Sequence, residues 1–264
     1  MKKPDWVIDK EKARRAAKHE TLWLFGLHAV RDALMNPMRD KLRLVVTLNA
    51  AQKLEDAIAA SGMTAEISDA RKFAAPIAAD SVHQGAALEV RPLDWGNTAA
   101  RCAPVDGAGL VVILDRVSDP HNVGAILRSA EVFGARAVIA TQRHAAPETG
   151  ALAKTASGAL ERQPYLRVRN LAEEMESLKD MGYVIVGLDG DGPQTLGQTL
   201  ASVPAGPIGL VLGAEGPGLR DKTRDTCDYI ARIPSAADFG SLNVSNAAAV
   251  ALYAARMAQP NTAA

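Results

Sequence analysis

The sequence predicts an α/β fold in which a mostly parallel sheet is covered by helices on both faces. Apolar runs such as LVVIL at 110–114 and IGLVL at 208–212 have the length and composition of strands that are buried on both sides. Helical stretches separate them; NLAEEMESLKDMG, for example, has Asn170 suited to begin a helix and Gly182 to end it. This alternation is typical of a parallel sheet. We expect strands at 110–115, 136–140, 164–168, 183–188, 208–212 and 229–233.

The composition of the chain excludes several classes of protein. The chain has 264 residues, of which 48% are hydrophobic, so it can bury a large core. Its formal net charge is zero, which argues against a protein that coats nucleic acid broadly, and any RNA contact would come from local patches. Cys102 and Cys227 lie far apart without metal-binding spacing, so we expect no metal site. The apolar runs are too short for a membrane span and the first twenty residues lack a signal sequence, which predicts a cytoplasmic protein.

The first half of the chain predicts a smaller α/β domain. Residues 1–20 form a charged tail, which is either a solvated face or an arm that touches RNA. Residues 21–92 alternate helix and strand, and residues 93–108 have the Gly, Pro and Asn content of a linker. Residues 109–264 then form the larger domain. Within the small domain, helices are expected at 26–37 and 51–62, and strands at 42–47 and 86–93.

Ligands of parallel sheets collect beyond the carboxyl ends of the strands, which directs attention to three loops. The first follows the strand at 110–115 and reads SDPHNVGAILR. Asn122 is placed to cap the helix that begins here. Gly124 and Arg128 are four residues apart and share a face near the helix N-terminus, where exposed amides favour an anion. A phosphate site and an ordinary surface arginine are both compatible with this segment.

The second and third loops carry glycines and hydrogen-bonding side chains. The second reads GAEGPGLR from Gly213 and matches neither the dinucleotide fingerprint nor the P-loop. Its glycines allow a ligand to approach the backbone, although a plain turn would also explain them. The third reads FGSLNVSNAAAV at 239–250 and enters an alanine-rich helix. Ser245 or Asn246 is expected to cap that helix, which leaves Ser241 and Asn243 available for a ligand. HExxH and GxSxG motifs are absent from the sequence, so a metallohydrolase or serine hydrolase fits poorly.

Together, the three loops resemble the three motifs of the SpoU/TrmH family of RNA ribose 2′-O-methyltransferases, within the SPOUT superfamily. The matching segments are N-V-G-x-x-x-R at 122–128, L-G-x-E-G-P-G-L at 212–219, and the I-P at 233–234 followed by S-L-N-V-S at 241–245. Each segment alone is weak, but their order and spacing are specific. GLHAV at 26–30, HQG at 83–85 and KTASGA at 154–159 resemble segments of the subgroup that modifies 23S rRNA.

The resemblance implies a function and an assembly. The large domain would be a SPOUT α/β trefoil-knot domain with a parallel sheet, and the small N-terminal domain would bind the RNA substrate. A homodimer would transfer a methyl group from S-adenosylmethionine to a ribose 2′-hydroxyl without a metal. The leading hypothesis for the substrate is a guanosine in 23S rRNA. The same chemistry on tRNA, a non-catalytic RNA-binding protein of the same fold and a nucleotide-dependent small-molecule enzyme are the alternatives.

The resemblance also implies which residues form the site. The methyl donor would be held around the backbone of the second and third loops. The cofactor-binding residues would be Gly213, Glu215, Gly216, Ile233 and Leu242. The reaction centre would be lined by Asn122, Arg128, Glu215, Ser241 and Asn243. Because a guanidinium stays protonated in proteins, we expect Arg128 to anchor a phosphate and stabilise developing negative charge rather than to act as the base. Glu215 is chemically the better base, and the alternative is that it holds the cofactor or the arginine.

Overall fold

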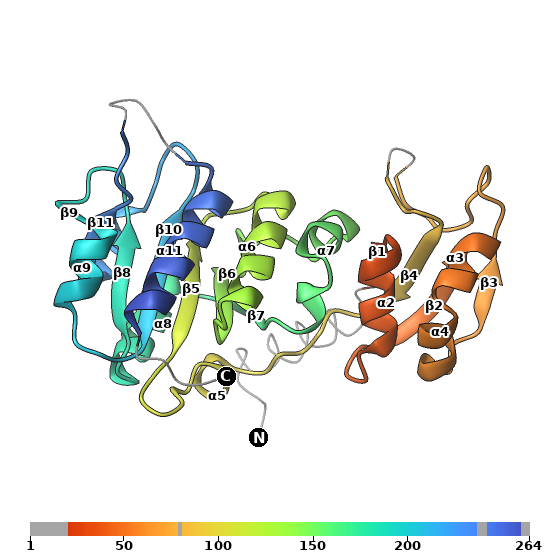
Figure 1. Cartoon of the computed structure of the whole chain (residues 1–264), viewed down its shortest axis with the longest axis horizontal. Helices are drawn as coiled ribbons and strands as arrows, with labels where there is room; N and C mark the ends of the chain where they lie inside the picture. The colour runs from red at the N-terminus through yellow and green to blue at the C-terminus, as the bar shows by residue number, and fades with distance from the viewer. Residues whose placement is uncertain (1–20, 79–80, 237–241, 260–264) are drawn as a thin grey trace, which may run out of the picture. The chain divides into compact units, whose positions relative to one another are not determined.

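The computed structural model describes residues 21–78, 81–236 and 242–259, and it divides into two compact units (Figure 1). The first unit contains the chain up to Asp94 together with Glu148–Glu161. The second unit contains Trp95–Pro147 and the chain from Arg162 onward. Residues 148–161 therefore pack with a unit from which they are distant in sequence, a feature that the sequence analysis did not include.

The first unit is built on a four-stranded sheet in the order β1-β4-β2-β3. Strand β4 pairs antiparallel with both β1 and β2, and β3 pairs parallel with β2. The expected strands near 42–47 and 86–93 are confirmed, whereas β1 and β3 were not expected. The elements of this unit are β1 (Leu22–Phe25), α2 (Leu27–Met35), β2 (Lys41–Val46), α3 (Leu48–Lys53), α4 (Glu55–Ser61), β3 (Ala65–Ile67), β4 (Ala86–Val90), α7 (Gly150–Ala156) and the 3₁₀ turn η1 (Ala159–Glu161).

The expected helix over 51–62 is two helices, α3 and α4, which meet at Leu54. Thr47 begins α3 because its side chain accepts a hydrogen bond from the amide of Ala50. Gly62 ends α4 as expected, with a left-handed φ of 67° that glycine adopts without a steric penalty. The prediction of helical structure here is correct, and the break within it was missed.

The second unit is built on a seven-stranded parallel sheet in the order β7-β6-β5-β10-β8-β11-β9. All six expected strands are present within one or two residues of their expected bounds, and the two-residue β9 is additional. The elements are α5 (Thr98–Arg101), β5 (Leu110–Asp115), α6 (Pro120–Val132), β6 (Ala137–Thr141), β7 (Tyr165–Val168), α8 (Leu171–Asp180), β8 (Val184–Leu188), β9 (Gln194–Thr195), α9 (Leu196–Ser202), β10 (Ile208–Gly213), α10 (Asp221–Thr226), β11 (Tyr229–Arg232) and α11 (Val244–Ala258).

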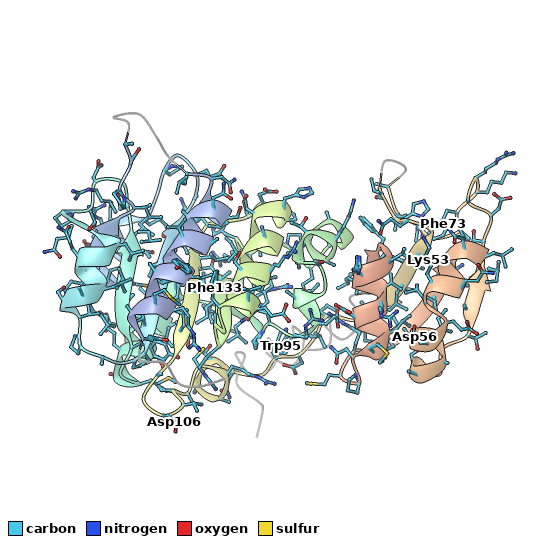
Figure 2. All side chains as sticks on the ribbon, viewed as in Figure 1. Lys53, Asp56, Phe73, Trp95, Asp106 and Phe133 are labelled. Carbon is cyan, nitrogen blue, oxygen red and sulfur yellow. The ribbon has the colours of Figure 1, made fainter. Side chains whose placement is uncertain are left out.

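Helices cover the central strands, and every residue of β5 and β6 is buried. Helix α11 packs on α6 and α9, and the three lie in front of the sheet in Figure 1. The alanines of α11 explain this close packing, because Ala248, Ala251 and Ala255 are fully buried and add little lateral bulk. Phe133, labelled in Figure 2, lies at the end of α6. Its ring meets that of Tyr253 on α11 edge to face, with centroids 6.1 Å apart.

The segment expected as a linker packs in part against the second unit. Residues 98–101 form α5, and Cys102 is fully buried, with its carbonyl accepting a 2.7 Å hydrogen bond from the Tyr183 hydroxyl. Burial raises the pKa of the Cys102 and Cys227 thiols to about 12, so both remain protonated at neutral pH. Among the described residues, no cluster of His, Cys, Asp or Glu is arranged to hold a metal ion. No helix in that part of the chain is long and apolar enough to cross a membrane.

Candidate active site

Three loops of the second unit meet beyond the carboxyl ends of neighbouring strands. They follow β5, β10 and β11, and β8 is the only strand between β10 and β11 in the described sheet. In a parallel sheet these strand ends lie at one edge, and the strand order reverses direction in this region, as at the ligand-binding crevices of other open α/β sheets. The three loops are those that the sequence analysis selected.

The first loop leads into α6, and here the predicted cap is wrong. Asp119, not Asn122, caps the helix: its carboxylate accepts hydrogen bonds from the amides of His121 and Asn122. Pro120 occupies the first helical position, where its missing N–H costs nothing. The side chain of Asn122 is therefore not needed at the helix end and is available for contacts with the other loops.

Asn122, Glu215 and Asn243 bring the three loops together through their side chains. Oε1 of Glu215 accepts hydrogen bonds from Nδ2 of Asn122 at 3.2 Å and from Nδ2 of Asn243 at 2.8 Å. Nδ2 of Asn243 also donates to Oδ1 of Asn122 at 2.9 Å, and the amide of Val244 donates to the same Glu215 oxygen at 3.3 Å. Three residues far apart in sequence thus form one hydrogen-bonded junction.

The junction is also attached to the first turn of α11, because Asn243 of the third loop caps this helix. Asn243 is the N-cap, since its Oδ1 accepts hydrogen bonds from the amide and the hydroxyl of Ser245 at 2.9 and 2.5 Å. The expectation that Ser245 or Asn246 caps this helix is therefore wrong. Asn243 uses its carbonyl oxygen to begin the helix and its amide nitrogen to hold the other two loops, so it has a structural role and a site role together.

A pocket of about 780 Å³ lies next to the junction, a size typical of small-molecule sites. Its lining includes all five residues expected to bind a cofactor, namely Gly213, Glu215, Gly216, Ile233 and Leu242. Acidic side chains line it as well, from Asp189, Asp191 and Glu215, and no Lys or Arg is found among the described lining residues. Such a lining suits a ligand that carries positive charge.

The glycine-rich turn folds back against the end of its own strand. A side chain at Gly213 would collide with the backbone of Gly218, whose amide donates to the carbonyl of Ala214 at 2.9 Å. Gly216 and Gly218 have left-handed φ values of 85° and 67°. Glycine is therefore required here by a close backbone approach and by conformation, and at Gly213, Gly216 and Gly218 the turn presents backbone to the pocket.

Asp115 braces this turn and was not identified from the sequence. It is fully buried at the end of β5, and its carboxylate accepts hydrogen bonds from the amide of Arg220 at 3.0 Å and from Nε of Arg220 at 2.7 Å. An aspartate at the end of an otherwise apolar strand was the available signal, because a buried carboxylate needs a partner. The turn is thus fixed by the sheet at Gly213 and by Asp115 at Arg220.

The loop after β8 also lines the pocket and was missed. Asp189 lies within it, with one carboxylate oxygen paired to Arg224 and the other accepting from the amide of Asp191 at 3.0 Å. Gly192 lies so close to the backbone of Ala231 that a side chain would collide. The run LDGDG at 188–192, directly after a predicted strand, was the signal that could have identified this wall.

The remaining expected site residues lie outside this arrangement. Arg128 is exposed on α6, is not part of the pocket lining, and makes no ion pair or hydrogen bond with the described residues. Gly124 is buried, and the carboxylate of Asp119 accepts hydrogen bonds from the first amides of the helix. Anion binding at Gly124 and Arg128 stays a prediction. Ser241 falls outside the described residues.

Comparison with known proteins gives the family. The SpoU rRNA Methylase family matches residues 109–253, more than half of the chain. The chain belongs to this family. A relative named 23S rRNA (guanosine-2′-O-)-methyltransferase RlmB from Photobacterium profundum is 37% identical over 242 residues, covering 88% of this chain and 96% of the relative. A protein of the same name from Pseudomonas aeruginosa is 42% identical over 178 residues, covering 66% of this chain and 71% of that protein.

Solved structures of SpoU methyltransferases share the fold. The crystal structure of AviRb from Streptomyces viridochromogenes, in complex with the cofactor AdoMet, aligns with a TM-score of 0.74 at 26% identity. The alignment covers 94% of this chain and 92% of that chain. The α/β fold with a parallel sheet that was expected for a SpoU methylase is therefore confirmed.

Proposed function

We propose that this protein transfers a methyl group from S-adenosylmethionine to the ribose 2′-hydroxyl of a guanosine in 23S rRNA. The observation that carries the proposal is the junction of Asn122, Glu215 and Asn243 beside the glycine-lined pocket. The family assignment and the relatives named 23S rRNA (guanosine-2′-O-)-methyltransferase support the reaction and the substrate. We also propose the cytoplasm as its location, where a bacterial ribosomal RNA would be met.

The pocket fits S-adenosylmethionine in size, charge and backbone access. The donor carries positive charge on its sulfonium and its amino group, and the lining provides Asp189, Asp191 and Glu215. We propose that the backbone around Gly213, Gly216 and Ile233 and the side chain of Leu242 hold the donor. When bound, it would supply an electrophilic methyl group on sulfur.

The chain's own residues would position the hydroxyl and stabilise charge. Transfer requires the ribose oxygen to approach the methyl carbon in line, and correct positioning can supply a large share of the rate. Glu215 and Asn243 line the pocket, and Asn122 is hydrogen-bonded to both. Asn122 and Asn243 would orient the ribose. We propose that Arg128, from the same helix as Asn122, binds the adjacent phosphate and stabilises the developing alkoxide.

Loosening the brace of the glycine-rich turn should weaken donor binding. In an Asp115→Ala variant, Arg220 loses two hydrogen bonds to a buried carboxylate, so we expect the free energy of unfolding to fall by about 2 kcal/mol. Donor affinity should fall about tenfold because the turn is no longer fixed. Titration calorimetry with S-adenosylmethionine measures this, and the exposed Asp225→Ala on α10 is the control. If a folded Asp115→Ala protein binds S-adenosylmethionine with unchanged affinity, the contact of Asp115 with Arg220 is not needed for donor binding.

We propose that the first unit binds the RNA. This assignment covers the predicted domain at 21–92 and rests on its resemblance to the substrate-binding module of the 23S rRNA subgroup. GLHAV and HQG adjoin one another in this unit, since Oε1 of Gln84 accepts a hydrogen bond from the amide of Leu27 at 3.1 Å. The charged tail at 1–20, which was considered as a possible RNA-touching arm, falls outside the described residues.

We further propose that two copies associate through the outer faces of α6 and α11. Val132, Val250, Tyr253 and Met257 are large apolar side chains that remain exposed there, with Tyr253 56% exposed. Large apolar side chains that remain exposed on neighbouring helices are typical of an interface. A Tyr253→Glu variant should sediment as a monomer at concentrations where the wild type is a dimer. Leu48→Glu, at an exposed leucine of α3, is the control, and an unchanged mass for Tyr253→Glu would exclude this interface.

The proposed reaction can be tested with purified protein and labelled S-adenosylmethionine. Incubation with 23S rRNA transcript, 16S rRNA transcript and bulk tRNA should label 23S rRNA alone, at a ribose 2′-oxygen. Label in tRNA alone would favour the tRNA alternative, and a protein that binds RNA without binding the donor would favour a non-catalytic role. These outcomes separate the substrate from the reaction itself.

A further inference from the structure

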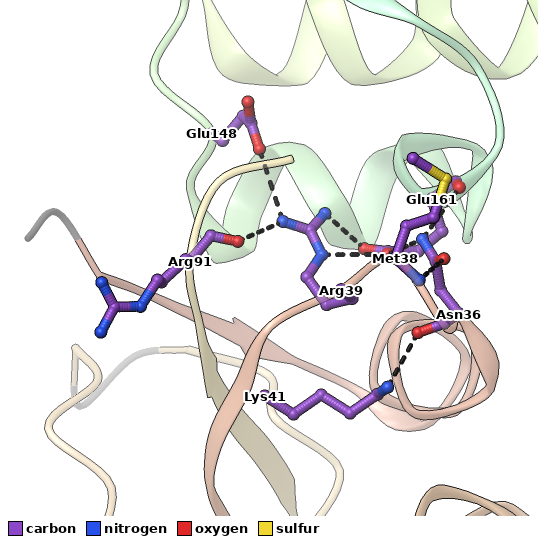
Figure 3. A network of polar contacts seen from close by, with 7 residues as sticks. All are labelled: Asn36, Met38, Arg39, Lys41, Arg91, Glu148 and Glu161. Carbon is purple, nitrogen blue, oxygen red and sulfur yellow. Dashed lines mark hydrogen bonds and ion pairs between the residues drawn. The ribbon is translucent and has the colours of Figure 1, made fainter. Parts of the chain in front are cut away.

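A buried ion pair joins two distant segments of the first unit. The guanidinium of Arg39, which follows α2, is fully buried and donates from Nε to Oε2 of Glu161 at 3.0 Å and from Nη2 to Oε1 at 2.7 Å (Figure 3). Its Nη1 donates to the carbonyl of Arg91 at 2.7 Å and lies 3.8 Å from Oε2 of Glu148. The paired fork geometry gives strength and a defined orientation.

Asn36 holds the same glutamate from a second direction. Its Nδ2 donates to Oε2 of Glu161 at 2.9 Å and to the Glu161 carbonyl at 3.2 Å. Asn36 is fixed in turn, because its Oδ1 accepts from the amide of Met38 and its carbonyl accepts from Nζ of Lys41, at 2.9 and 2.8 Å (Figure 3). Both carboxylate oxygens of Glu161 are therefore bound by residues from the first part of the chain.

In the sequence, the segment that contains Glu161 lies between two strands of the second unit's sheet. Residues 148–161 lie between β6 and β7, and the chain is anchored in the second unit on either side of them. Before the segment, the carbonyl of Ala146 accepts from the Tyr165 hydroxyl at 3.3 Å. After it, Arg162 pairs with Glu131, and the carbonyl of Pro164 accepts from the amide of Val138 at 2.8 Å.

These contacts leave very short connections between residues 148–161 and the second unit. Only Pro147 separates Ala146, held in the second unit, from Glu148 in the first, and Glu161 and Arg162 are consecutive. With the segment docked, the units are joined at three chain crossings, at 94–95, 147–148 and 161–162. If residues 148–161 were not docked, the peptide bond between residues 94 and 95 would be the only chain connection between residues 21–94 and the second unit. Each short additional connection reduces the freedom of one unit relative to the other.

We propose that the Arg39–Glu161 ion pair is a positioning device for the proposed methyl transfer. By docking residues 148–161 into the RNA-binding unit, it joins that unit to the connection that leaves β6. Strand β6 neighbours β5, and β5 is followed by the helix that carries Asn122. We expect this docking to raise the turnover of RNA that is held on the first unit. Arg39 and Glu161 touch no substrate, and the inference rests on the proposed function.

The expected signature is a loss of turnover at unchanged binding. Glu161→Gln removes one of the charges, so the amides of 150–156 should exchange with solvent at least about tenfold faster. The kcat for 23S rRNA transcript should fall about tenfold, while the Kd values for the transcript and for S-adenosylmethionine stay within about twofold. Asn36→Ala should show the same pattern more weakly. The matched control is Glu66→Gln, which removes an exposed ion pair with Arg43 in the same unit.

A second variant separates docking from simple loss of stability. Replacing a buried ion pair by apolar residues can preserve packing. The double variant Arg39→Met with Glu161→Leu can therefore keep residues 148–161 docked without the ion pair. If exchange of 150–156 is slow in the double variant, kcat should return to the wild-type value; if exchange is fast, kcat should be low. Wild-type kcat with fast exchange would overturn the proposal, as would low kcat with slow exchange or an RNA affinity that falls in proportion to kcat. A wild-type protein that methylates no RNA would instead overturn the proposed function.

Discussion

An Arg128→Ala variant is expected to lose methyl transfer while keeping its affinity for S-adenosylmethionine. Arg128 is exposed on α6 outside the pocket lining and makes no hydrogen bond or ion pair with the described residues, so its removal leaves the donor site unchanged. If it stabilises charge that develops on the ribose oxygen and its phosphate, kcat should fall at least about 100-fold. Single-turnover kinetics on 23S rRNA transcript, together with donor calorimetry, measure both quantities.

The control for lost positive charge is Lys222→Ala, at an exposed cation on α10 of the same unit. Its kcat should match the wild type. Arg128→Lys keeps the charge but not the planar fork, and it should recover part of the rate. A loss of donor affinity in Arg128→Ala would contradict the assignment of this residue to the RNA side of the reaction.

Glu215→Gln should remain an active enzyme, whereas Glu215→Ala should lose nearly all activity. Oε1 of Glu215 accepts hydrogen bonds from Asn122, Asn243 and the amide of Val244, and a glutamine carbonyl can accept from the same donors. Alanine removes the acceptor that joins the second loop to the other two, which remain connected only through the hydrogen bond from Asn243 to Asn122. We therefore expect kcat/KM within about tenfold of the wild type for Gln and a fall of more than about 100-fold for Ala.

The glutamine variant also tests whether Glu215 is the general base. An amide cannot accept the hydroxyl proton, so a Gln variant as inactive as Ala, with intact donor affinity and an unchanged melting temperature, would assign the proton to Glu215 rather than to water. Asp225→Asn, at an exposed carboxylate on α10, controls for the loss of one negative charge. The structure favours the joining role because one carboxylate oxygen already serves three donors.

Much of the second unit follows from local sequence. Its central strands β5, β6 and β10 are apolar runs that are buried almost throughout, and such runs are recognisable without tertiary information. The first unit was harder to predict because its short strands β1 and β3 have four and three residues. The docking of 148–161 could not be predicted, because it depends on a buried pairing of Arg39 with Glu161 across more than a hundred residues.

The site residues were identified by their positions after strands, and the local errors have physical causes. Asp119 competes with Asn122 for the helix start and wins because Pro120 fits the next position. Asn243 replaces Ser245 as the cap because its amide group can also bind Glu215. Asp115 and the loop after β8 act through tertiary contacts, which leave only weak local signals. The trefoil knot and the role of Ser241 stay predictions.

The proposed reaction is best tested by mapping ribose methylation across all ribosomal and transfer RNAs from cells with and without this gene. We expect one guanosine of 23S rRNA to lose its 2′-O-methyl group in the deletion strain and to regain it when the wild-type gene is restored, but not when the Arg128→Ala gene is. An unchanged 23S rRNA, or a methyl group lost from tRNA instead, would contradict it.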